Sequence, residues 1–537
     1  MSMKIIRICG ILAGIALVVF GFVLSGVTGI LLWIAGGLAI LQGIPPAYDI
    51  LKPKKKEEVD IPDETIKQIA EQTADTIEAR QQEAQSFFDG LPETDNVKLK
   101  RIFDKGQVEE ARAAKVTAAI QQGGEEAAKQ YAEATLKAIE YYSKGLSANP
   151  KTSERCALYN LIGLAHLNIS QLDEAADAWE ESASLAGEMI KAEENTEEGQ
   201  IALAIATGNL GIVYGICGDL DRAEEMYHKA LKINEELDRK DGMASDYGNL
   251  GVVYKIRGDL KRAEEMHLKS LKINEELGLK EGMANQYGNL GIVYGIRGNL
   301  DRAEEMCYKA LKIDEELGRK EGMAKQYGNL GIIHKIRGNL DKSEEMYLKA
   351  LKIDEALGRK EGMASDYGNL GIVYKTRGDL DKAEEMYNKG LKIDRELGRK
   401  EGMASKHVNL GNIYQTRGDL DKAEEMYNKA LEINESLGNK EIMASLYGNL
   451  GVVYQTRGDL DKAEEMYNKA LKINEELGRK EGMAIQYGNL GVVYKTRGDL
   501  KKAGAHYRQA LKLFREMGAE PQIEWIIEHL KEIGAEP

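Results

Sequence analysis

Apolar residues recur along most of the chain at the spacing of amphipathic helices. In one representative stretch, the apolar residues stand at i, i+3, i+4 and i+7, which is one face of a helix; they are Tyr247, Leu250, Gly251 and Tyr254. A second apolar stripe follows directly and comprises Leu260, Ala263, His267, Ser270 and Leu271. The pattern predicts two helices, and each needs a neighbouring helix in order to bury its apolar side.

Glycines mark the expected ends of both helices. Gly258 follows the first stripe and Gly278 follows the second. A helix often ends on glycine, because the left-handed conformation is cheap for a residue without a Cβ. Asp259 is placed to cap the second helix with its carboxylate. Gly251 lies inside the first apolar face, where the missing side chain lets a neighbouring helix come close.

The helix pair occurs eight times at intervals of forty residues. An Asn-Leu dipeptide marks each copy, with its asparagine at Asn209, Asn249, Asn289, Asn329, Asn369, Asn409, Asn449 and Asn489. A fixed period in this range is typical of a solenoid, in which every unit buries its stripes against its neighbours. We therefore expect an all-α protein with eight stacked units over residues 203–517.

These residues resemble the tetratricopeptide repeat, with Leu-Gly-x-x-Tyr in the first helix and Ala, an aromatic residue and Ala in the second. The usual unit has about 34 residues. A forty-residue unit with a longer second helix and no closing proline resembles the variety found in the Pins/LGN family and, less closely, kinesin light chain. The resemblance implies a right-handed α-solenoid of helix-turn-helix repeats that binds proteins, with the first helices lining its concave surface.

Both ends of the repeat array diverge from the common pattern. Over residues 125–202, Ala138 and Tyr142 match second-helix positions, and a further unit is marked by Gly163, Ala175 and Trp179. Within 518–537, an amphipathic segment carries Trp525, Ile526, Ile527 and Leu530. Terminal units of solenoids are atypical because they have a neighbour on one side only. We therefore interpret 125–202 as divergent repeats and 518–537 as a capping helix.

Two uncharged apolar runs, residues 8–24 and 27–44, stand near the start of the chain. Each is just long enough to cross a hydrocarbon core of roughly 30 Å at about 1.5 Å per residue. The basic residues outside the pair are Lys4, Arg7, Lys52, Lys54, Lys55 and Lys56. By the positive-inside tendency, we expect a transmembrane hairpin over 1–46, which meets the membrane through residues 5–44, and cytoplasmic repeats. The alternatives are a single long span or a re-entrant segment, which leave the orientation open.

Residues 47–124 form a basic juxtamembrane segment followed by a polar helical linker. The lysines of this segment would lie among anionic headgroups. Between 60 and 88 the linker carries a thin apolar stripe of Ile66, Ile69, Thr73, Ile77, Ala84 and Phe87. This stripe fits a stalk, a short coiled coil or a helix lying on the first repeats.

Charge and motif content exclude several functions. A formal net charge of -15 argues against non-specific binding of nucleic acid, which needs a basic surface. The sequence contains no Gly-rich phosphate loop, His-Glu-x-x-His, Cys-x-x-Cys or Gly-x-Ser-x-Gly motif. His267, His334 and His407 replace the tyrosine of most copies, so we interpret them as packing residues. We expect no enzyme activity, cofactor or metal.

A second stripe of the first helix faces away from its apolar side. At about 100° per residue, Ser245, Asn249, Val252 and Ile256 point roughly 180° from the apolar stripe. The family resemblance places this stripe in the concave groove. We call these residues, their equivalents in other copies and the adjacent lysines the ladder positions. The candidate partner-binding residues are Ser245, Asn249, Val252, Lys255, Ile256, Asn289, Ile292, Asn329, Ile332, Lys335, Asn369, Ile372, Lys375, Asn409, Asn412, Asn449, Val452, Asn489, Val492 and Lys495.

The chemistry of the ladder favours a polypeptide ligand. A row of asparagine amides can donate to and accept from the main chain of an extended segment irrespective of its sequence. Apolar residues that face water in a continuous row mark a contact surface, and the lysines favour an acidic ligand. We predict a groove for an extended or helical segment that is partly apolar and partly acidic. The alternative is structural: the asparagines brace the adjoining helix, and the Ile/Val row packs on the next first helix.

The predicted function is a membrane-anchored scaffold that binds protein partners. Two alternatives remain open, namely a self-assembling homo-oligomer and a regulator that senses a small molecule in the groove. The copies over 363–498 are nearly identical, so part of the array is also compatible with a spacer.

Overall fold

The computed structural model of the protein describes residues 125–148, 150–169, 171–193 and 196–537. The regular elements in these ranges are twenty α-helices, with no strand among them. The expected transmembrane hairpin (1–46), the linker (47–124) and its apolar stripe lie outside the described residues. The described chain divides into two compact units, one ending at Asp366 and the other beginning at Tyr367.

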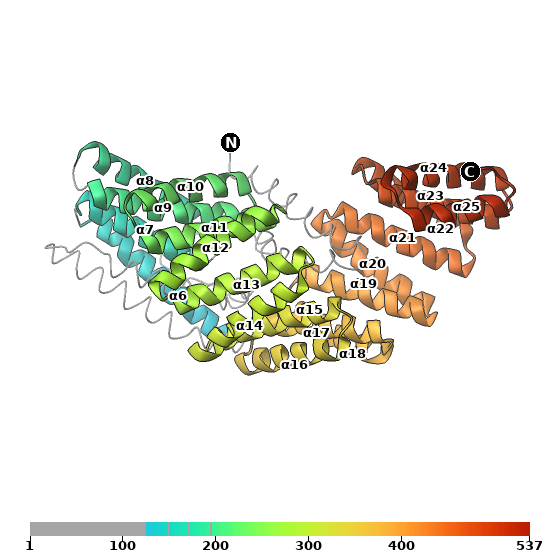
Figure 1. Cartoon of the computed structure of the whole chain (residues 1–537), viewed down its shortest axis with the longest axis horizontal. Coiled ribbons are helices and arrows are strands. Elements are labelled where there is room, and N and C mark those ends of the chain that lie inside the picture. Colours follow the sequence, from blue (N-terminus) through green and yellow to red (C-terminus); the bar gives the residue numbers. More distant parts are fainter. Residues whose placement is uncertain (1–124, 149, 170, 194–195) are drawn as a thin grey trace, which may run out of the picture. The chain divides into compact units, whose positions relative to one another are not determined.

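The helices of the first unit follow one another as antiparallel neighbours (Figure 1). They are α6 (Glu125–Leu146), α7 (Thr152–Asn168), α8 (Leu172–Lys191), α9 (Thr196–Ile216), α10 (Leu220–Glu236), α11 (Lys240–Ile256), α12 (Leu260–Leu277), α13 (Lys280–Ile296), α14 (Leu300–Leu317), α15 (Lys320–Ile336) and α16 (Leu340–Leu357). α17 (Lys360–Arg377) begins in the first unit and continues into the second. The second unit then contains α18 (Leu380–Glu396), α19 (Lys400–Arg417), α20 (Leu420–Leu437), α21 (Lys440–Arg457), α22 (Leu460–Glu476), α23 (Lys480–Thr496), α24 (Leu500–Met517) and α25 (Glu520–Glu532).

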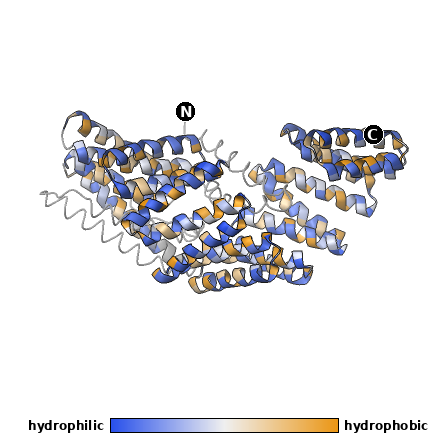
Figure 2. Cartoon of the chain, in the orientation of Figure 1, coloured by the Kyte–Doolittle hydropathy of each residue, from blue (hydrophilic) through white to orange (hydrophobic). Residues whose placement is uncertain are grey.

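We call the odd-numbered helices from α9 to α23 the A helices and the even-numbered helices from α10 to α24 the B helices. Apart from α17, which spans the boundary between the two units, each A helix packs against the helix that precedes it and the helix that follows it. Successive A helices also touch, as α9 does with α11, α11 with α13, α13 with α15 and α21 with α23. Hydrophobic and hydrophilic residues alternate around the helices (Figure 2), as expected where each helix is packed on part of its surface.

The A and B helices of one repeat meet at a glycine. A Cβ at Gly331 would lie 2.7 Å from the ring of Tyr347, which is fully buried. At Gly251 the same atom would lie 2.6 Å from the imidazole of His267, which is also fully buried. Any side chain at this position would push the two helices apart, so the close approach predicted for Gly251 is confirmed.

The helix ends also follow the predicted pattern. Gly258 and Gly278 have φ angles of +79° and +68°, in the left-handed region that favours glycine. The carboxylate of Asp259 accepts a hydrogen bond of 3.1 Å from the backbone N–H of Arg262, at the start of α12. This cap satisfies one of the N–H groups that the first turn of a helix leaves without an intrahelical partner.

The first described helices repeat the same packing in a diverged form. Ala138 and Tyr142 of α6 are fully buried. A Cβ at Gly163 of α7 would lie 2.7 Å from the indole of Trp179 in α8. The glycine–aromatic contact of the regular repeats therefore exists here with tryptophan in the place of tyrosine.

The last helix, α25, packs on α24, but its buried face differs from the expected one. Ile523, Ile526 and Leu530 are buried at i, i+3 and i+7, whereas Trp525 is 42% exposed. Because a helix turns by about 100° per residue, Trp525 lies beside the covering face, with the edge of its ring toward Tyr507.

Among the described residues, α9 is the one helix long and apolar enough to cross a membrane, judged by length and composition. Half of its most apolar stretch is buried, and it packs between α8 and α10. We therefore describe α9 as a core helix of the first unit. The expected anchor concerns residues 8–44, outside the described ranges.

Candidate functional site

In each unit, the ladder positions form a half-buried row on the A helices. Ser245 is exposed. The asparagines and the aliphatic residues are all intermediate in exposure; they are Asn249, Asn289, Asn329, Asn369, Asn409, Asn449 and Asn489, together with Val252, Ile256, Ile292, Ile332, Ile372, Val452 and Val492. The remaining surface of each side chain is accessible to a partner.

Most of the ladder asparagines keep their hydrogen-bonding groups unused. Asn409 is the exception, because its amide donates to the carbonyl of Ser405 at 3.1 Å and its Oδ1 accepts from Lys375 Nζ at 3.5 Å. The other six make no hydrogen bond with a described side chain or backbone group; they are Asn249, Asn289, Asn329, Asn369, Asn449 and Asn489. An amide offers two donors and an acceptor, so each of these side chains is equipped to bind a peptide group.

The lysines beside the ladder differ from one another. Lys255 is 8% exposed, and burial lowers its pKa to about 8. Burial also lowers the pKa of Lys375. Lys335 is half-buried, and Lys495 forms an ion pair with Glu532 of α25. The sequence predicted a row of exposed cationic lysines. In the structure, Lys255 and Lys375 are largely removed from solvent, and Lys495 is paired with Glu532.

Asn412 is also engaged within its own repeat. The hydroxyl of Tyr427, from the following B helix, lies 2.7 Å from Asn412 Oδ1 and 2.7 Å from Gln415 Oε1. Gln455 holds Tyr467 in the same way at 2.8 Å. In these repeats the polar residues of the A helix fix the B-helix tyrosine, so Asn412 is a weaker candidate for contact with a partner than the unbonded asparagines.

One buried polar position of the A helix was not predicted from the sequence. It lies immediately before the first aromatic residue of the apolar stripe and is 8% exposed or less in every copy from α11 onward; it holds Asp246, Gln286, Gln326, Asp366, Lys406, Leu446 and Gln486. In the nearly identical copies, this residue changes its chemistry from one repeat to the next. That variation was the available sequence signal.

This position meets a buried polar residue of the preceding B helix. Asn234 donates to Asp246 Oδ2 at 2.8 Å, and Lys406 Nζ lies 2.7 Å from Asp394 Oδ2. Each such pair joins two successive repeats at the centre of their interface. This position therefore connects neighbouring repeats, and none of its residues belongs to the ladder positions.

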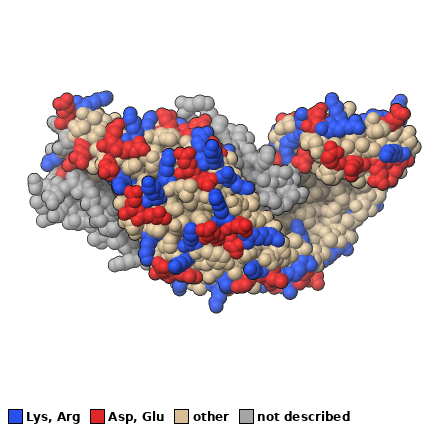
Figure 3. Space-filling model, viewed as in Figure 1, with Lys and Arg blue, Asp and Glu red and all other residues tan. Residues whose placement is uncertain are grey.

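Two further features of the described surface concern its charges and its possible metal ligands. Acidic and basic side chains are interspersed on the face of the molecule seen in Figure 3. Within the described ranges, no group of three or more His, Cys, Asp or Glu residues is placed to hold a metal ion. The ladder is the surface that the fold repeats in copy after copy.

Comparisons with known proteins agree with this architecture. The family model described as "Tetratricopeptide repeat" matches residues 202–276, 282–356, 323–396, 402–476 and 442–516, which together cover more than half of the chain. No curated protein matches the chain.

Several solved structures are similar. The Signal Transduction ATPase with Numerous Domains (STAND) protein from Pyrococcus horikoshii, which has a tetratricopeptide repeat sensor, is 14% identical, with a TM-score of 0.50 over 75% of this chain and 72% of that chain. BtubC (BKLC) from P. vanneervenii is 26% identical, with a TM-score of 0.38, and the match covers 42% of this chain and 92% of that chain. The apo form of the quorum sensor NprR from B. thuringiensis is 14% identical, with a TM-score of 0.46, and the match covers 65% of this chain and 99% of that chain. At these values the likeness to the STAND protein concerns the fold alone.

Proposed function

Because this chain belongs to the tetratricopeptide repeat family, we propose that it is a scaffold that binds segments of other proteins along its A helices. The observation that carries this proposal is a set of six half-buried ladder asparagines, found in both units, whose amides make no hydrogen bond with the described residues. An extended segment laid across the A helices would meet one amide and one aliphatic side chain in each repeat. The amides can bind a main chain irrespective of its sequence, and the aliphatic side chains add hydrophobic contacts.

The apolar part of this surface is concentrated in the first unit. The last ladder position is isoleucine in its A helices, as at Ile256 and Ile336, and threonine in those of the second unit. Thr416 and Thr456 each donate to a carbonyl of their own helix at 2.8 Å, which leaves the hydroxyl occupied. We infer that a partner makes its main contacts with the first unit, where Ile256 and Ile336 extend the apolar part of the ladder.

The test removes three ladder residues from α15 in the full chain, Asn329, Ile332 and Lys335, each changed to alanine. A photo-crosslinker at Ile292 first identifies the bound protein. The affinity of the purified partner is then measured for the wild-type protein and the variant. We expect binding to weaken by at least about tenfold, which is roughly 1.4 kcal/mol, with helicity and melting temperature unchanged.

A matched control changes three exposed residues of α12, Lys261, Glu265 and Lys272, to alanine. This variant should bind as the wild type does, because its B-helix surface lies away from the ladder. Equal loss in both variants would place the binding surface elsewhere. Loss of helicity in the α15 variant would reassign its three residues to structure.

We further propose that residues 8–44 anchor the scaffold in a membrane, with the repeats on the cytoplasmic side. The support comes from the two apolar runs and the lysines and arginine that flank them. The full chain should remain in the membrane fraction after alkaline carbonate extraction, and a variant that begins at residue 60 should be released. Release of the full chain would contradict the anchor. Protease cleavage of the repeats in intact cells would contradict the orientation.

A further inference from the structure

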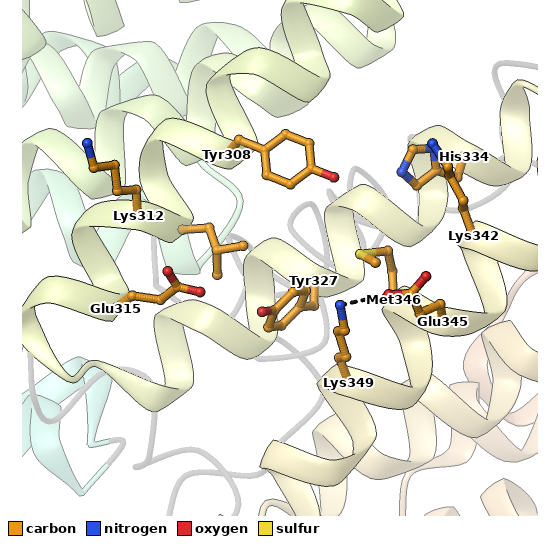
Figure 4. A pocket seen from close by; sticks show the side chains of 10 residues that line it. Tyr308, Lys312, Glu315, Tyr327, His334, Lys342, Glu345, Met346 and Lys349 are labelled. Atoms are coloured by element: carbon orange, nitrogen blue, oxygen red, sulfur yellow. Dashed lines mark ion pairs between the residues drawn. The ribbon is translucent and has the colours of Figure 1, made fainter.

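A pocket of about 430 Å³ opens between two B helices of the first unit, α14 and α16, above the A helix that separates them. Figure 4 shows His334 and Lys342 at one end of the pocket, Lys312 and Glu315 at the other, and the ring of Tyr327 between them. Tyr327 belongs to the apolar stripe, which faces away from the ladder positions of α15. The pocket is therefore separate from the proposed partner-binding surface.

The pocket forms where one repeat departs from all its sister copies. His334 occupies the position that is tyrosine in the other seven, which are Tyr214, Tyr254, Tyr294, Tyr374, Tyr414, Tyr454 and Tyr494. In the repeat before it, the hydroxyl of Tyr294 donates to Glu264 of the preceding B helix at 2.8 Å. Imidazole is shorter than phenol, and His334 Nε2 stays 3.7 Å from Glu304 Oε1. The shorter side chain leaves more room at this end of the pocket than a tyrosine would.

His334 also leaves a polar atom without a partner. Its side chain is 2% exposed, and Nδ1 is buried with no hydrogen bond to any described residue. A buried polar atom without a partner costs roughly 1–3 kcal/mol. The ring at this position therefore makes poorer polar contacts than the tyrosine of the sister copies, whose hydroxyl reaches a glutamate in the repeat before it.

The walls of the pocket are aromatic and apolar. Tyr308 is 46% exposed, at a position that holds asparagine in most copies of the second unit. Lys349 Nζ lies 5.5 Å from the centroid of the Tyr327 ring, and Leu311 and Met346 add aliphatic surface. Aromatic rings in such surroundings bind another ring by stacking or edge contacts. The volume lies near the lower end of ligand pockets, about 300–1,000 Å³, so it suits one aromatic group.

The pocket has charges of both signs, with Lys312 and Glu315 at one end, and the end that contains Lys342 favours an anion. Lys349 is paired with Glu345 at 2.8 Å. Lys312 and Lys342 form no ion pair with a described residue. Lys342 stands at the same end of the pocket as His334 (Figure 4). The ammonium group of Lys342 can make a charge-assisted hydrogen bond with a carboxylate at this end.

We propose that this pocket binds an aromatic ring that carries, or lies next to, a carboxylate, with the ring at Tyr308 and Tyr327 and the carboxylate at Lys342 and His334. An acidic, aromatic segment of a protein and a free aromatic acid share this chemistry. The site lies outside the ladder and works independently of it. Loss of one does not imply loss of the other.

The experiment measures calorimetric binding of three probes to the full chain. N-acetyltryptophan has a ring and a carboxylate, N-acetyltryptophanamide has the ring alone, and acetyl-Glu-Trp-amide presents both as a peptide. We expect both acidic probes to bind at least about tenfold more tightly than the uncharged amide. Tighter binding of the dipeptide identifies a protein segment as the natural source, and tighter binding of N-acetyltryptophan identifies a free acid.

Two variants and one control locate the binding. His334→Tyr restores the residue of the sister copies and narrows the end of the pocket assigned to the carboxylate, so both acidic probes should bind at least about tenfold more weakly. Lys342→Met should reduce their affinity to that of the amide. The control, Lys422→Met, changes the equivalent lysine of the second unit, where Tyr414 is present, and should change nothing.

The site is overturned if no probe binds, or if His334→Tyr binds the acidic probes as the wild type does. Equal affinity of the amide and the two acids overturns the carboxylate assignment. Circular dichroism checks that the variants are folded. If His334→Tyr does not fold, Lys342→Met decides the question through the same titrations.

Discussion

Lys406 Nζ lies 2.7 Å from Asp394 Oδ2, and both side chains are almost completely removed from solvent, at 2% and 0% exposure. The pair joins α18 to α19 at the position where successive repeats meet. The next interface of the same unit has Asn434 and Leu446 instead. Repeats with nearly identical surfaces thus differ at the buried position through which they contact their neighbours.

Removal of one partner of this pair should be strongly destabilising. Lys406→Leu leaves Asp394 buried, with Arg399 at 3.5 Å as its remaining cation, and we expect a loss of about 3–5 kcal/mol. The double variant Asp394→Asn/Lys406→Leu copies the pair at Asn434 and Leu446, so it should recover most of that loss. Hydrogen exchange of α18 and α19 is the suitable measurement, because repeat arrays do not always unfold in one step.

The control for this pair is Lys392→Leu, at an exposed position of α18, which should change stability by less than about 0.5 kcal/mol. If Lys406→Leu lost as little stability as this control, the buried ion pair would contribute little to the stability of the protein. A double variant as unstable as Lys406→Leu would show that the site cannot adopt the chemistry of the neighbouring interface.

Two glycines of α15 should respond in opposite directions to the same change. At Gly331 an added Cβ would lie 2.7 Å from the ring of Tyr347, whereas at Gly328 it would meet nothing within 4 Å. We expect Gly331→Ala to cost about 1–3 kcal/mol through overpacking. Gly328→Ala should stabilise the helix by roughly 0.5–1 kcal/mol. Thermal unfolding of both variants checks this, and shifts of the same sign would contradict the packing described here.

Local patterns predicted the helices well, because their ends are set by residues with fixed backbone or capping preferences. Gly258, Gly278 and Asp259 act within a few residues of their own position in the chain, so their roles follow from sequence spacing. The contact at Gly251 was also predictable, since a glycine within the apolar face of a helix lets the helix that packs on that face come close. These features depend on a single repeat.

Features that depend on how repeats stack were not predictable in the same way. The ion pair between Lys495 and Glu532 and the contact of Asn412 with Tyr427 join different helices. Helical periodicity gives the face of a residue but not the side chain opposite it. The burial of Lys406 was missed for this reason, because a lysine next to the apolar stripe normally indicates a solvated edge. His334 was interpreted correctly as a buried residue, but periodicity could not show the open volume beside it.

The capping helix provides a test in which sequence and structure differ. The size of Trp525 favours it as the main contact of α25, yet it is 42% exposed while Ile526 is fully buried. Ile526→Ala should therefore cost about 2–5 kcal/mol through the cavity it leaves. Trp525→Ala should cost less, because it loses mainly ring contacts with Tyr507 and His529. Hydrogen exchange of α25 measures both, and a larger effect for Trp525→Ala would contradict the packing.

A buried carboxylate should make the stability of the first unit depend on pH. Asp314 is 1% exposed, and burial raises its pKa to about 6, although Arg319 Nη1 lies only 3.1 Å from its Oδ1. Between about pH 4 and pH 6 the folded chain holds a proton that the unfolded chain has released. Stability therefore falls as the pH rises through this window, by roughly 1.4 kcal/mol per unit of pKa shift. Below and above this window, the ionisation of Asp314 causes no further change of stability with pH.

Asp314→Asn should remove this dependence, because an amide resembles the protonated acid and cannot ionise. The equivalent residues Asn234 and Asn274 show that asparagine fits the position. Urea unfolding should give similar stabilities for the two proteins near pH 4 and a more stable variant at pH 7. The exposed control Asp301→Asn should not change the slope with pH. A constant difference between wild type and Asp314→Asn from pH 4 to pH 7 would mean that the Arg319 contact, and not burial, controls the ionisation of Asp314.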